Sequence, residues 1–286
     1  MVALVFASTS AATQSAPVLR LDRSFVWSMD ASWFGGWSGL EVTDNGRSLV
    51  TVSDKGRFLQ ARMLRDDGHL AGVEIRRSVP LLDPKNRQLK HKRSDAEGLA
   101  IGSDGIIHVS FEHFHRLMQI DPATGRTKQK TKLPRDLKVK PNGGIEALAI
   151  GPDGTIFALA EHHLGRTSRP YPLYAYANGK WLVAATIPKR GRFRPVGADF
   201  DPQGRFWLLE RATTLLGFRS RIRRFDLSAP NLAEETLLTT FPGRFDNLES
   251  ISVWQDTAGQ TRLTLMSDDN FLSIQRTEII EFFVTN

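Results

Sequence analysis

A repeated pattern of apolar and polar positions organises this chain. A short apolar run, a glycine-containing turn and a second apolar run occur five times. The first runs lie at 39–42, 97–101, 146–150, 197–200 and 249–253, and the second runs at 49–53, 106–111, 156–160, 206–209 and 263–267. Turns such as Ser103-Asp104-Gly105 favour hairpins, because glycine tolerates the positive φ that a tight turn needs. The second runs are almost continuously apolar, which is typical of strands buried on both faces.

Two further strand-like runs follow each of the first four hairpins. They lie at 58–63 and 72–79, 116–120 and 127–133, 172–176 and 181–187, and 221–226 and 234–241. Equivalent residues recur about every 50 positions, since Leu99 and Leu148 are 49 residues apart and Leu148 and Ala198 are 50 apart. Four short strands per unit at this period are typical of a β-propeller, so we predict an all-β propeller.

The fifth copy lacks a fourth strand, because only the run 277–284 follows its hairpin. The strand-like run 18–27 at the other end of the chain is unassigned. We predict that it completes the last blade and closes the ring, since closure removes exposed sheet edges. The prediction is therefore one domain of five four-stranded blades over residues 17–286, with six blades as the alternative if the loop 80–94 contains a degenerate blade. Residues 1–16 are assigned to a signal-peptide remnant or a disordered tail.

Composition favours anionic partners. The 286 residues carry a formal net charge of +7, which suits phosphate esters, nucleic acid or a membrane surface. The absence of cysteine excludes disulfides, thiolate catalysis and cysteine-based zinc sites. The Ala- and Ser-rich segment 7–16 resembles the end of a secretory signal that lacks its basic start, and we expect no membrane span. We therefore expect a periplasmic or secreted protein, with a cytoplasmic one as the alternative.

Carboxylates recur at equivalent places in the repeat. In a propeller the innermost strand begins, and the second strand ends, at the same rim of the central channel. The acids at these places are Asp54, Glu112, Glu161, Glu210 and Asp268 after the second runs, and Glu97, Glu146 and Glu249 at the start of first runs. So many acids cannot all stay ionised without compensation, so either their pKa values rise or a cation lies among them. Oxygen ligands at this density suit Ca²⁺ best and other divalent cations less. The alternative is that each acid caps loop backbone on its own.

Basic residues and histidines lie in loops at the same predicted rim. We assign substrate binding to Lys55, Lys92, Arg93, Lys140, Arg194 and Arg211. His113 and His162 directly follow two of the acids and, with Glu97 and Glu146, are the candidate catalytic groups. The alternative for the histidines is hydrogen bonding within loops. An acidic centre inside a cationic collar suits metal-assisted attack on an anionic ester, in which Arg and Lys hold the oxygens.

Several other kinds of site are not indicated. The segment Gly36-Trp37-Ser38-Gly39 lacks the spacing of a nucleophile elbow and precedes no helix. The chain has no HExxH zinc motif and no phosphate-binding P-loop. Nucleic acid is not expected as a partner, because an acidic centre would repel its backbone.

The repeat motifs also resemble a known family. The segments that carry the resemblance are Asp95-Ala96-Glu97-Gly98-Leu99, Asn142-Gly143-Gly144-Ile145-Glu146-Ala147-Leu148, Leu208-Leu209-Glu210-Arg211, Asp246-Asn247-Leu248-Glu249-Ser250-Ile251 and Ser267-Asp268-Asp269-Asn270-Phe271. They are similar to the bacterial family named for an esterase-like activity of phytase, from about Phe34 onwards. The resemblance implies an exported propeller related to Ca²⁺-dependent phytases, which hydrolyse phosphate monoesters.

Three functions remain open from the sequence. The first is an exported, Ca²⁺-dependent or other divalent-metal-dependent hydrolase of phosphate or related esters, with its site at the channel mouth. The second is a non-catalytic propeller that binds an anionic ligand or a protein partner, because a fold alone does not decide function. The third is a lactonase-like metal hydrolase. We expect a small anionic substrate or ligand and a monomer.

Overall fold

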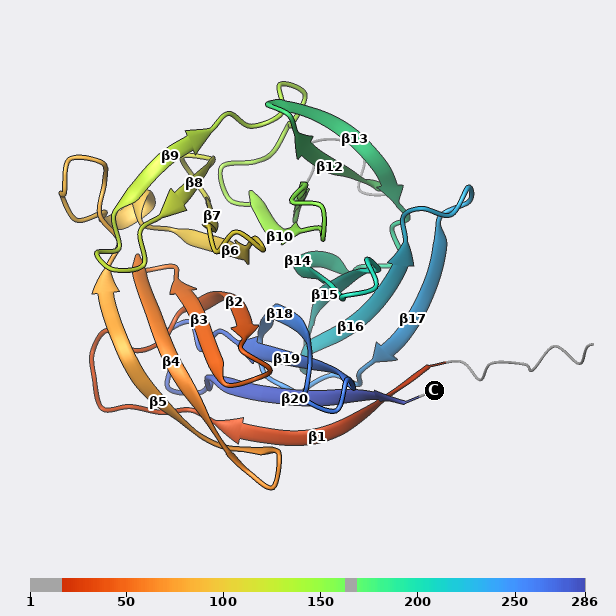
Figure 1. Ribbon diagram of the computed structural model, residues 1–286, viewed down its shortest axis with the longest axis horizontal. Coiled ribbons are helices and arrows are strands. Elements are labelled where there is room, and N and C mark those ends of the chain that lie inside the picture. The colour runs from red at the N-terminus through yellow and green to blue at the C-terminus, as the bar shows by residue number, and fades with distance from the viewer. Residues whose placement is uncertain (1–16, 163–168, 286) are drawn as a thin grey trace, which may run out of the picture.

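The computed structural model describes residues 17–162 and 169–285, and these form a five-bladed β-propeller (Figure 1). Each blade is a four-stranded antiparallel sheet, as the repeat predicted. The loop 80–94 contains only a short 3₁₀ turn, η1 (His91–Arg93), and an isolated bridge at Leu82, so the six-bladed alternative is wrong. The predictions for residues 1–16 lie outside the described residues.

The blades follow the chain, and we number them in that order. Blade 1 contains β2 (Trp37–Thr43), β3 (Ser48–Ser53), β4 (Arg57–Asp66) and β5 (His69–Pro80). Blade 2 contains β6 (Ala96–Ile101), β7 (Ile107–Phe111), β8 (Arg116–Ile120) and β9 (Thr127–Thr131). Blade 3 contains β10 (Ile145–Ile150), β11 (Ile156–Ala160), β12 (Tyr171–Ala177) and β13 (Lys180–Ile187). Blade 4 contains β14 (Arg194–Phe200), β15 (Phe206–Thr214), β16 (Gly217–Asp226) and β17 (Ala233–Thr239). Blade 5 contains β18 (Leu248–Gln255), β19 (Thr261–Ser267), β20 (Glu278–Thr285) and β1 (Val18–Val26).

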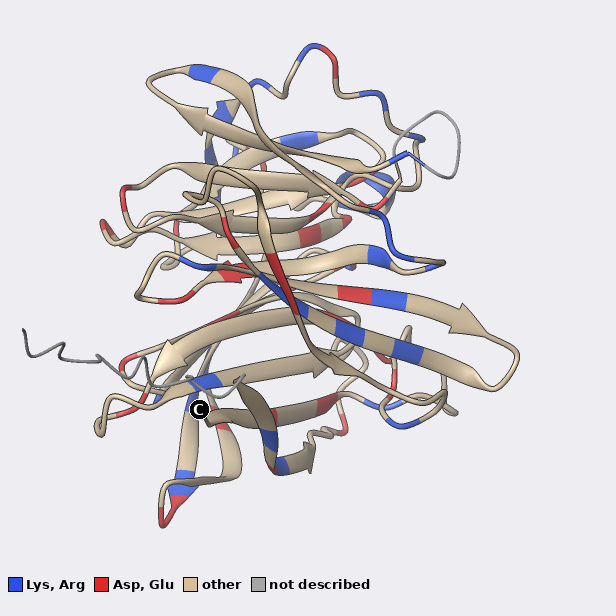
Figure 2. Cartoon of the chain, turned by 90° about the vertical axis from the view of Figure 1, so that its right-hand side faces the viewer, with Lys and Arg blue, Asp and Glu red and all other residues tan. Residues whose placement is uncertain are grey.

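The hydrophobic core lies between neighbouring blades. Side chains from both faces of each sheet are buried, so each apolar cluster joins residues of two blades; Val52 of blade 1, for example, packs in one cluster with Val109 of blade 2. The inner and second strands are buried along nearly their whole length, whereas the outer strand β13 alternates between exposed and half-buried residues. Figure 2 shows the stacked blades edge-on. Among the described residues no helix is long and apolar enough to cross a membrane.

The N-terminal strand closes the ring, as predicted. β1 pairs with β20 along its whole length, from Val18 opposite Thr285 to Val26 opposite Glu278. The order of blade 5 is therefore β1-β20-β19-β18, with the two ends of the described chain side by side (Figure 1).

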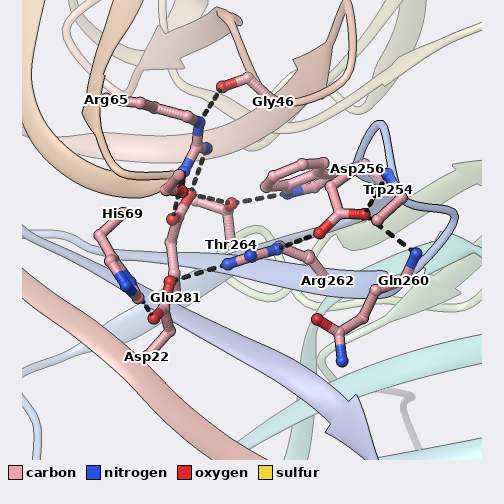
Figure 3. Close-up of polar contacts among 12 residues, drawn as sticks. Asp22, Gly46, Arg65, His69, Trp254, Asp256, Gln260, Arg262, Thr264 and Glu281 are labelled. Carbon is pink, nitrogen blue, oxygen red and sulfur yellow. Dashed lines mark hydrogen bonds and ion pairs between the residues drawn. The ribbon is translucent and has the colours of Figure 1, made fainter.

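A buried polar network reinforces this closure (Figure 3). The Asp22 carboxylate of β1 lies 2.5 Å from Nδ1 of His69 in blade 1 and 2.8 Å from Nη1 of Arg262 in β19. The carboxylate of Glu281 in β20 accepts two 2.8 Å hydrogen bonds from Arg65 of blade 1 and a third from Thr264. The network therefore joins β1 and β20 to the first blade.

The first two strands of every blade share one irregularity that shapes the channel. Their register shifts by one residue near the start of the inner strand, which leaves Ser38, Glu97, Glu146, Val196 and Glu249 as the extra residue of a β-bulge. A bulge re-aims the side chain that it carries. The next residue is small in every blade, being Gly39, Gly98, Ala147, Gly197 and Ser250. A Cβ on Gly98 would lie 2.6 Å from the carbonyl oxygen of Glu146 in the next blade, so glycine allows the two backbones to approach.

Candidate functional site

One end of the channel is built from two sets of equivalent residues, and we call this end the mouth. The bulged residues Ser38, Glu97, Glu146, Val196 and Glu249 form the first set. The second set lies at the end of the second strand of each blade, opposite the bulge of the inner strand. One backbone contact, repeated from blade to blade, identifies its members. The N–H of Asp54, Glu112, Glu161 and Asp268 donates to the carbonyl of the residue two positions before the bulge, and Arg211 pairs with Arg194 in the same place. The second set is therefore Asp54, Glu112, Glu161, Arg211 and Asp268.

The structure contradicts the sequence assignment in blade 4. Arg211, not Glu210, occupies the position equivalent to the other acids, because Glu210 pairs with Pro195 inside the sheet. A shift of one residue along a strand moves the side chain to the other face. The Glu210 carboxylate is fully buried between two guanidinium groups, 2.7 Å from Nε of Arg221 and 2.6 Å from Nη2 of Arg223. Glu210 is therefore part of a structural ion-pair network, and its assignment as a metal ligand is wrong.

Glu97 and Glu146 are the carboxylates with the least compensation at the mouth. Burial raises the pKa of Glu97 well above its usual value, and the charges of Glu146 and Glu249 raise it further. Burial likewise raises the pKa of Glu146, with Glu161 adding to the effect and Arg211 opposing it. Within the described part of the chain, neither side chain forms a hydrogen bond or an ion pair. Both carboxylates are thus held in a repulsive field that a cation would relieve.

Three further acids of the mouth show the same effect. Burial raises the pKa of Asp268 to about 8, with Glu249 as the next cause, although the Asn270 N–H donates to its carboxylate at 2.7 Å. Burial raises the pKa of Asp54 against the stabilising charge of Lys55, whose Nζ lies 3.0 Å from Oδ2. Burial also raises the pKa of Glu112, which accepts a hydrogen bond from the N–H of Gly144. The field therefore extends over the mouth from blade 5 to blade 3.

Within the described residues, Asp95, Glu112 and His113 form a close group of metal-ligating atoms. One ligand atom from each lies within 4.8 Å of the other two. Nε2 of His113 lies 3.2 Å from Oδ2 of Asp95. Asp95 stands two positions before the bulged Glu97, and its carbonyl accepts from the N–H of Glu112. Sequence reasoning did not identify Asp95 as a site residue. The equivalent residue of blade 5, two positions before the bulged Glu249, is Asn247.

The other side of the mouth is compensated by arginine. Arg211 donates to Glu249 and to Oδ1 of Asn247, and its Nη2 lies 3.6 Å from Glu161. Arg194 lies at the same distance, 3.6 Å, from that carboxylate. Burial acts to lower the pKa of Arg211, but the charges of Glu249 and Glu146 raise it above its usual value. The guanidinium therefore stays charged and takes the place that a cation would have there.

The two candidate histidines lie on different sides of the mouth. His113 contacts Asp95 on the uncompensated side. Nδ1 of His162 lies 2.5 Å from Oε2 of Glu161, and burial lowers the pKa of His162 although Glu161 opposes this. The pair of His162 and Glu161 thus belongs to the side that Arg211 compensates.

Two clefts open beside the acids and contain most of the basic candidates. A cleft of about 650 Å³ is lined by Lys55, Lys90, His91 and Lys92 together with Asp54, Asp95 and His113. A second cleft of about 480 Å³ is lined by Lys189, Arg192, Arg194 and Arg211 together with Glu161. The structure therefore brings Lys55 and Lys92 together in the first cleft and Arg194 and Arg211 in the second.

The remaining two basic candidates lie outside both clefts. The guanidinium of Arg93 packs over the ring of Phe114, 5.2 Å from its centroid. Lys140 is exposed, and its carbonyl accepts a 3.0 Å hydrogen bond from Nε2 of His115.

A second layer lies deeper along the inner strands. Glu41, Ala100, Ala149, Asp199 and Ser252 occupy equivalent positions, judged by their partners in the second strands. Here the acids have partners: the N–H groups of Val253 and Phe200 donate to Asp199, and the Ser252 hydroxyl donates to Glu41 at 3.2 Å. Burial nevertheless raises the pKa of Glu41, and the charge of Asp199 adds a smaller increase. Burial also raises the pKa of Asp199, to about 7. This layer therefore joins the inner strands of neighbouring blades by hydrogen bonds.

The residues of the uncompensated side fit a divalent cation. Carboxylate oxygens from Asp95, Glu97, Glu112 and Glu146 are the hard donors that such ions prefer. The raised pKa values of Glu97, Glu112 and Glu146 reflect the cost of bringing these carboxylates together without such an ion.

Comparison with known proteins identifies the family. The sequence profile described as "Phytase-like: Esterase-like activity of phytase" matches residues 32–271. The chain belongs to this family. No curated protein matches it significantly. A solved structure of the PQQ-bound aldose sugar dehydrogenase from Streptomyces coelicolor aligns with a TM-score of 0.50 at 13% identity, covering 95% of this chain and 99% of that one. A streptogramin B lyase aligns at 0.47 and 14% identity, covering 90% and 68%. The likeness to the dehydrogenase shows the fold alone.

Proposed function

We propose that this phytase-like protein hydrolyses phosphate or related esters with a divalent cation, Ca²⁺ first, held at the mouth. The observation that carries the proposal is the pair Glu97 and Glu146, two half-buried carboxylates that form no ion pair in the described chain. The family match supports hydrolysis of esters as the class of reaction.

The ligands that we propose are the acids of the uncompensated side. Asp95, Glu97, Glu112 and Glu146 would contribute most of the oxygens, with Asp54 and Asp268 at the edge. Glu249 and Glu161 are weaker candidates, because Arg211 already neutralises them. A bound divalent cation supplies an activated water and polarises the phosphoryl oxygen.

The first cleft would hold the anionic part of the substrate. Lys55 and Lys92 line it beside Asp54 and Asp95, so ammonium groups are available for the non-bridging oxygens of a phosphate. His113 lies in the same cleft within reach of Asp95, which orients the imidazole. His113 is therefore the proposed group that gives a proton to the leaving oxygen or takes one from the attacking water. His162 would have the lesser role, since it lies on the other side.

A second candidate function is binding of an anion without catalysis. The second cleft favours it, because four cationic side chains and one carboxylate surround a volume of about 480 Å³. An anionic ligand could bind there without any metal.

A turnover assay separates the two functions. Purified protein is assayed with p-nitrophenyl phosphate and with p-nitrophenyl carboxylic esters, in Ca²⁺ and in chelator. The proposal predicts turnover that needs the cation and that falls by more than about 100-fold in Glu97→Gln/Glu146→Gln, because even outer partners of metal ligands are worth about 10- to 100-fold. Glu74→Gln/Glu235→Gln, which changes two exposed acids of outer strands, should keep full activity. Absence of cation-dependent turnover on every ester would favour the anion binder.

A further inference from the structure

The face around the mouth carries exposed apolar side chains that the proposed function does not use. The most prominent lie at the tip of the hairpin formed by β15 and β16, where Leu215 is 104% exposed and Leu216 is 78% exposed. The hairpin continues four residues beyond Arg211, which corresponds to roughly 13 Å of extended strand. In Figure 2 this hairpin extends farther than its neighbours on the right-hand side.

The protruding tip is ordered by its own hydrogen bonds. The Thr214 hydroxyl donates to the carbonyl of Gly217 at 2.7 Å, and the N–H of Leu216 donates to that hydroxyl at 3.2 Å. The two leucines are therefore presented to solvent by a tight, bonded turn.

A second apolar side chain lies beside the hairpin. Phe241 is 85% exposed and follows β17. The segment 240–243 around Phe241 is hydrogen-bonded to β16. The N–H of Gly243 donates to the carbonyl of Phe218, and the N–H of Thr240 donates to the carbonyl of Ser220, both at 2.9 Å. The next blade adds Ile274, 86% exposed, in the loop between β19 and β20 at the same face. Four large apolar side chains thus project from one end of the molecule.

Cationic side chains stand at the base of these loops. Thr213 of the hairpin lines the second cleft together with Lys189, Arg192 and Arg194. Lys189 and Arg192, and Arg244 beside Phe241, have no ion-pair partner among residues 17–162 and 169–285. Three of the cations at the base of the projecting apolar tips, Lys189, Arg192 and Arg244, are therefore available to an anionic partner.

We propose that this face docks onto an anionic phospholipid bilayer, with Leu215, Leu216 and Phe241 inserted at the level of the acyl chains and the second cleft facing lipid phosphates. Apolar side chains on narrow tips, flanked by Lys and Arg, are suited to the interface of a membrane. A protein partner would need a contiguous surface of about 800 Å² on each side, which isolated tips do not supply. A second copy of this chain would bring two cationic collars together. The proposal is independent of whether the mouth is catalytic.

Vesicle sedimentation tests the proposal. Wild-type protein is mixed with vesicles of phosphatidylcholine alone and of phosphatidylcholine with phosphatidylglycerol. We expect binding to the anionic vesicles that weakens with salt, and little binding to the neutral ones. Leu215→Ser/Leu216→Ser should weaken binding by about tenfold or more, because each leucine loses the transfer of its side chain out of water. Lys189→Gln/Arg192→Gln should weaken binding to anionic vesicles by about fivefold for each charge removed, and should not change binding to neutral vesicles.

Two matched variants serve as controls. Leu182→Ser/Val183→Ser changes two exposed apolar side chains of the outer strand β13, and it should bind vesicles like the wild type. Leu216→Trp exchanges the leucine for another side chain that suits the membrane interface. It should retain binding, and its tryptophan fluorescence should shift to the blue on anionic vesicles. Circular dichroism confirms that each variant is folded.

Three results would overturn the proposal. The first is equal binding of the wild type and Leu215→Ser/Leu216→Ser to anionic vesicles. The second is no vesicle binding at all by the wild type, which would leave a protein as the occupant of this face. The third is a dimer in sedimentation velocity that Leu215→Ser/Leu216→Ser converts to a monomer, which would make a second copy the occupant.

Discussion

Two sets of buried carboxylates in this propeller have opposite surroundings. In blade 4, Glu210 is enclosed by Arg221 and Arg223, and Glu234 continues the network to Arg190. At the mouth, Glu97 and Glu146 face other acids, and Arg211, whose charge lowers the pKa of Glu146, is engaged with Glu249. A buried acid with matched cations fixes the structure, whereas a buried acid without them stores repulsion that a bound cation can relieve.

The largest expected effect comes from breaking the compensated set. Arg223→Met leaves Glu210 buried with Arg221 alone and should cost about 3–5 kcal/mol of unfolding free energy. Glu97→Gln removes a repelling charge, so in chelator its stability should equal or exceed that of the wild type. Urea unfolding of both variants provides the measurement. A loss below about 1 kcal/mol in Arg223→Met would show that the network is not structural.

The closure network should be less sensitive to a conservative change. Arg65→Lys keeps the charge beside Glu281 but loses the two-point hydrogen bonding and the 2.8 Å bond from Nε to the carbonyl of Gly46. We expect a loss of about 1–3 kcal/mol in thermal or urea unfolding. Arg76→Lys, at an exposed pair with Glu74, should change stability by less than about 0.5 kcal/mol. Equal effects of the two variants would contradict a role for the network in closure.

The deep layer should show a smaller effect that depends on pH. The pKa of Asp199 rises from its ordinary value of 3.8 to about 7 in the folded protein, through burial beside Glu41, with Ser252 and Asp201 as the other facing groups. Between these values the folded state holds more protons than the unfolded state, so stability falls as pH rises from about 4 to about 7. One such proton contributes a slope of at most about 1.4 kcal/mol per pH unit.

Asp199→Asn should reduce the fall of stability with rising pH by the share of this one proton, in unfolding curves recorded in chelator. Asp153→Asn, at an exposed turn where hydrogen bonds from Thr155 lower the pKa, is the matched control and should leave the slope in place. A pH dependence that is unchanged in Asp199→Asn would place its origin elsewhere.

The fold could be predicted from the sequence because the period is carried by local features. Each hairpin has its own turn and its own apolar runs, so five copies at about 50 residues define the blades without any knowledge of long-range contacts. Closure by the run 18–27 followed from counting strands.

The site could be predicted only in part, because it depends on register. The apolar run 206–209 ends before Glu210, but β15 continues to Thr214, and the one-residue difference exchanges Glu210 for Arg211. Spacing from the turn glycine held the missing information: Glu112, Glu161 and Arg211 each stand seven positions after Gly105, Gly154 and Gly204. The pairing of each acid with its neighbours depends on side-chain geometry, which no repeat pattern contains.

Calorimetric titration with Ca²⁺ tests the central claim most directly. The wild type should bind Ca²⁺, Glu97→Gln/Glu146→Gln should lose binding while remaining folded, and Glu74→Gln/Glu235→Gln should bind like the wild type. Because these substitutions keep the shape of each side chain, the difference reports the carboxylate charges alone. An unchanged titration in Glu97→Gln/Glu146→Gln would contradict a cation site at the mouth.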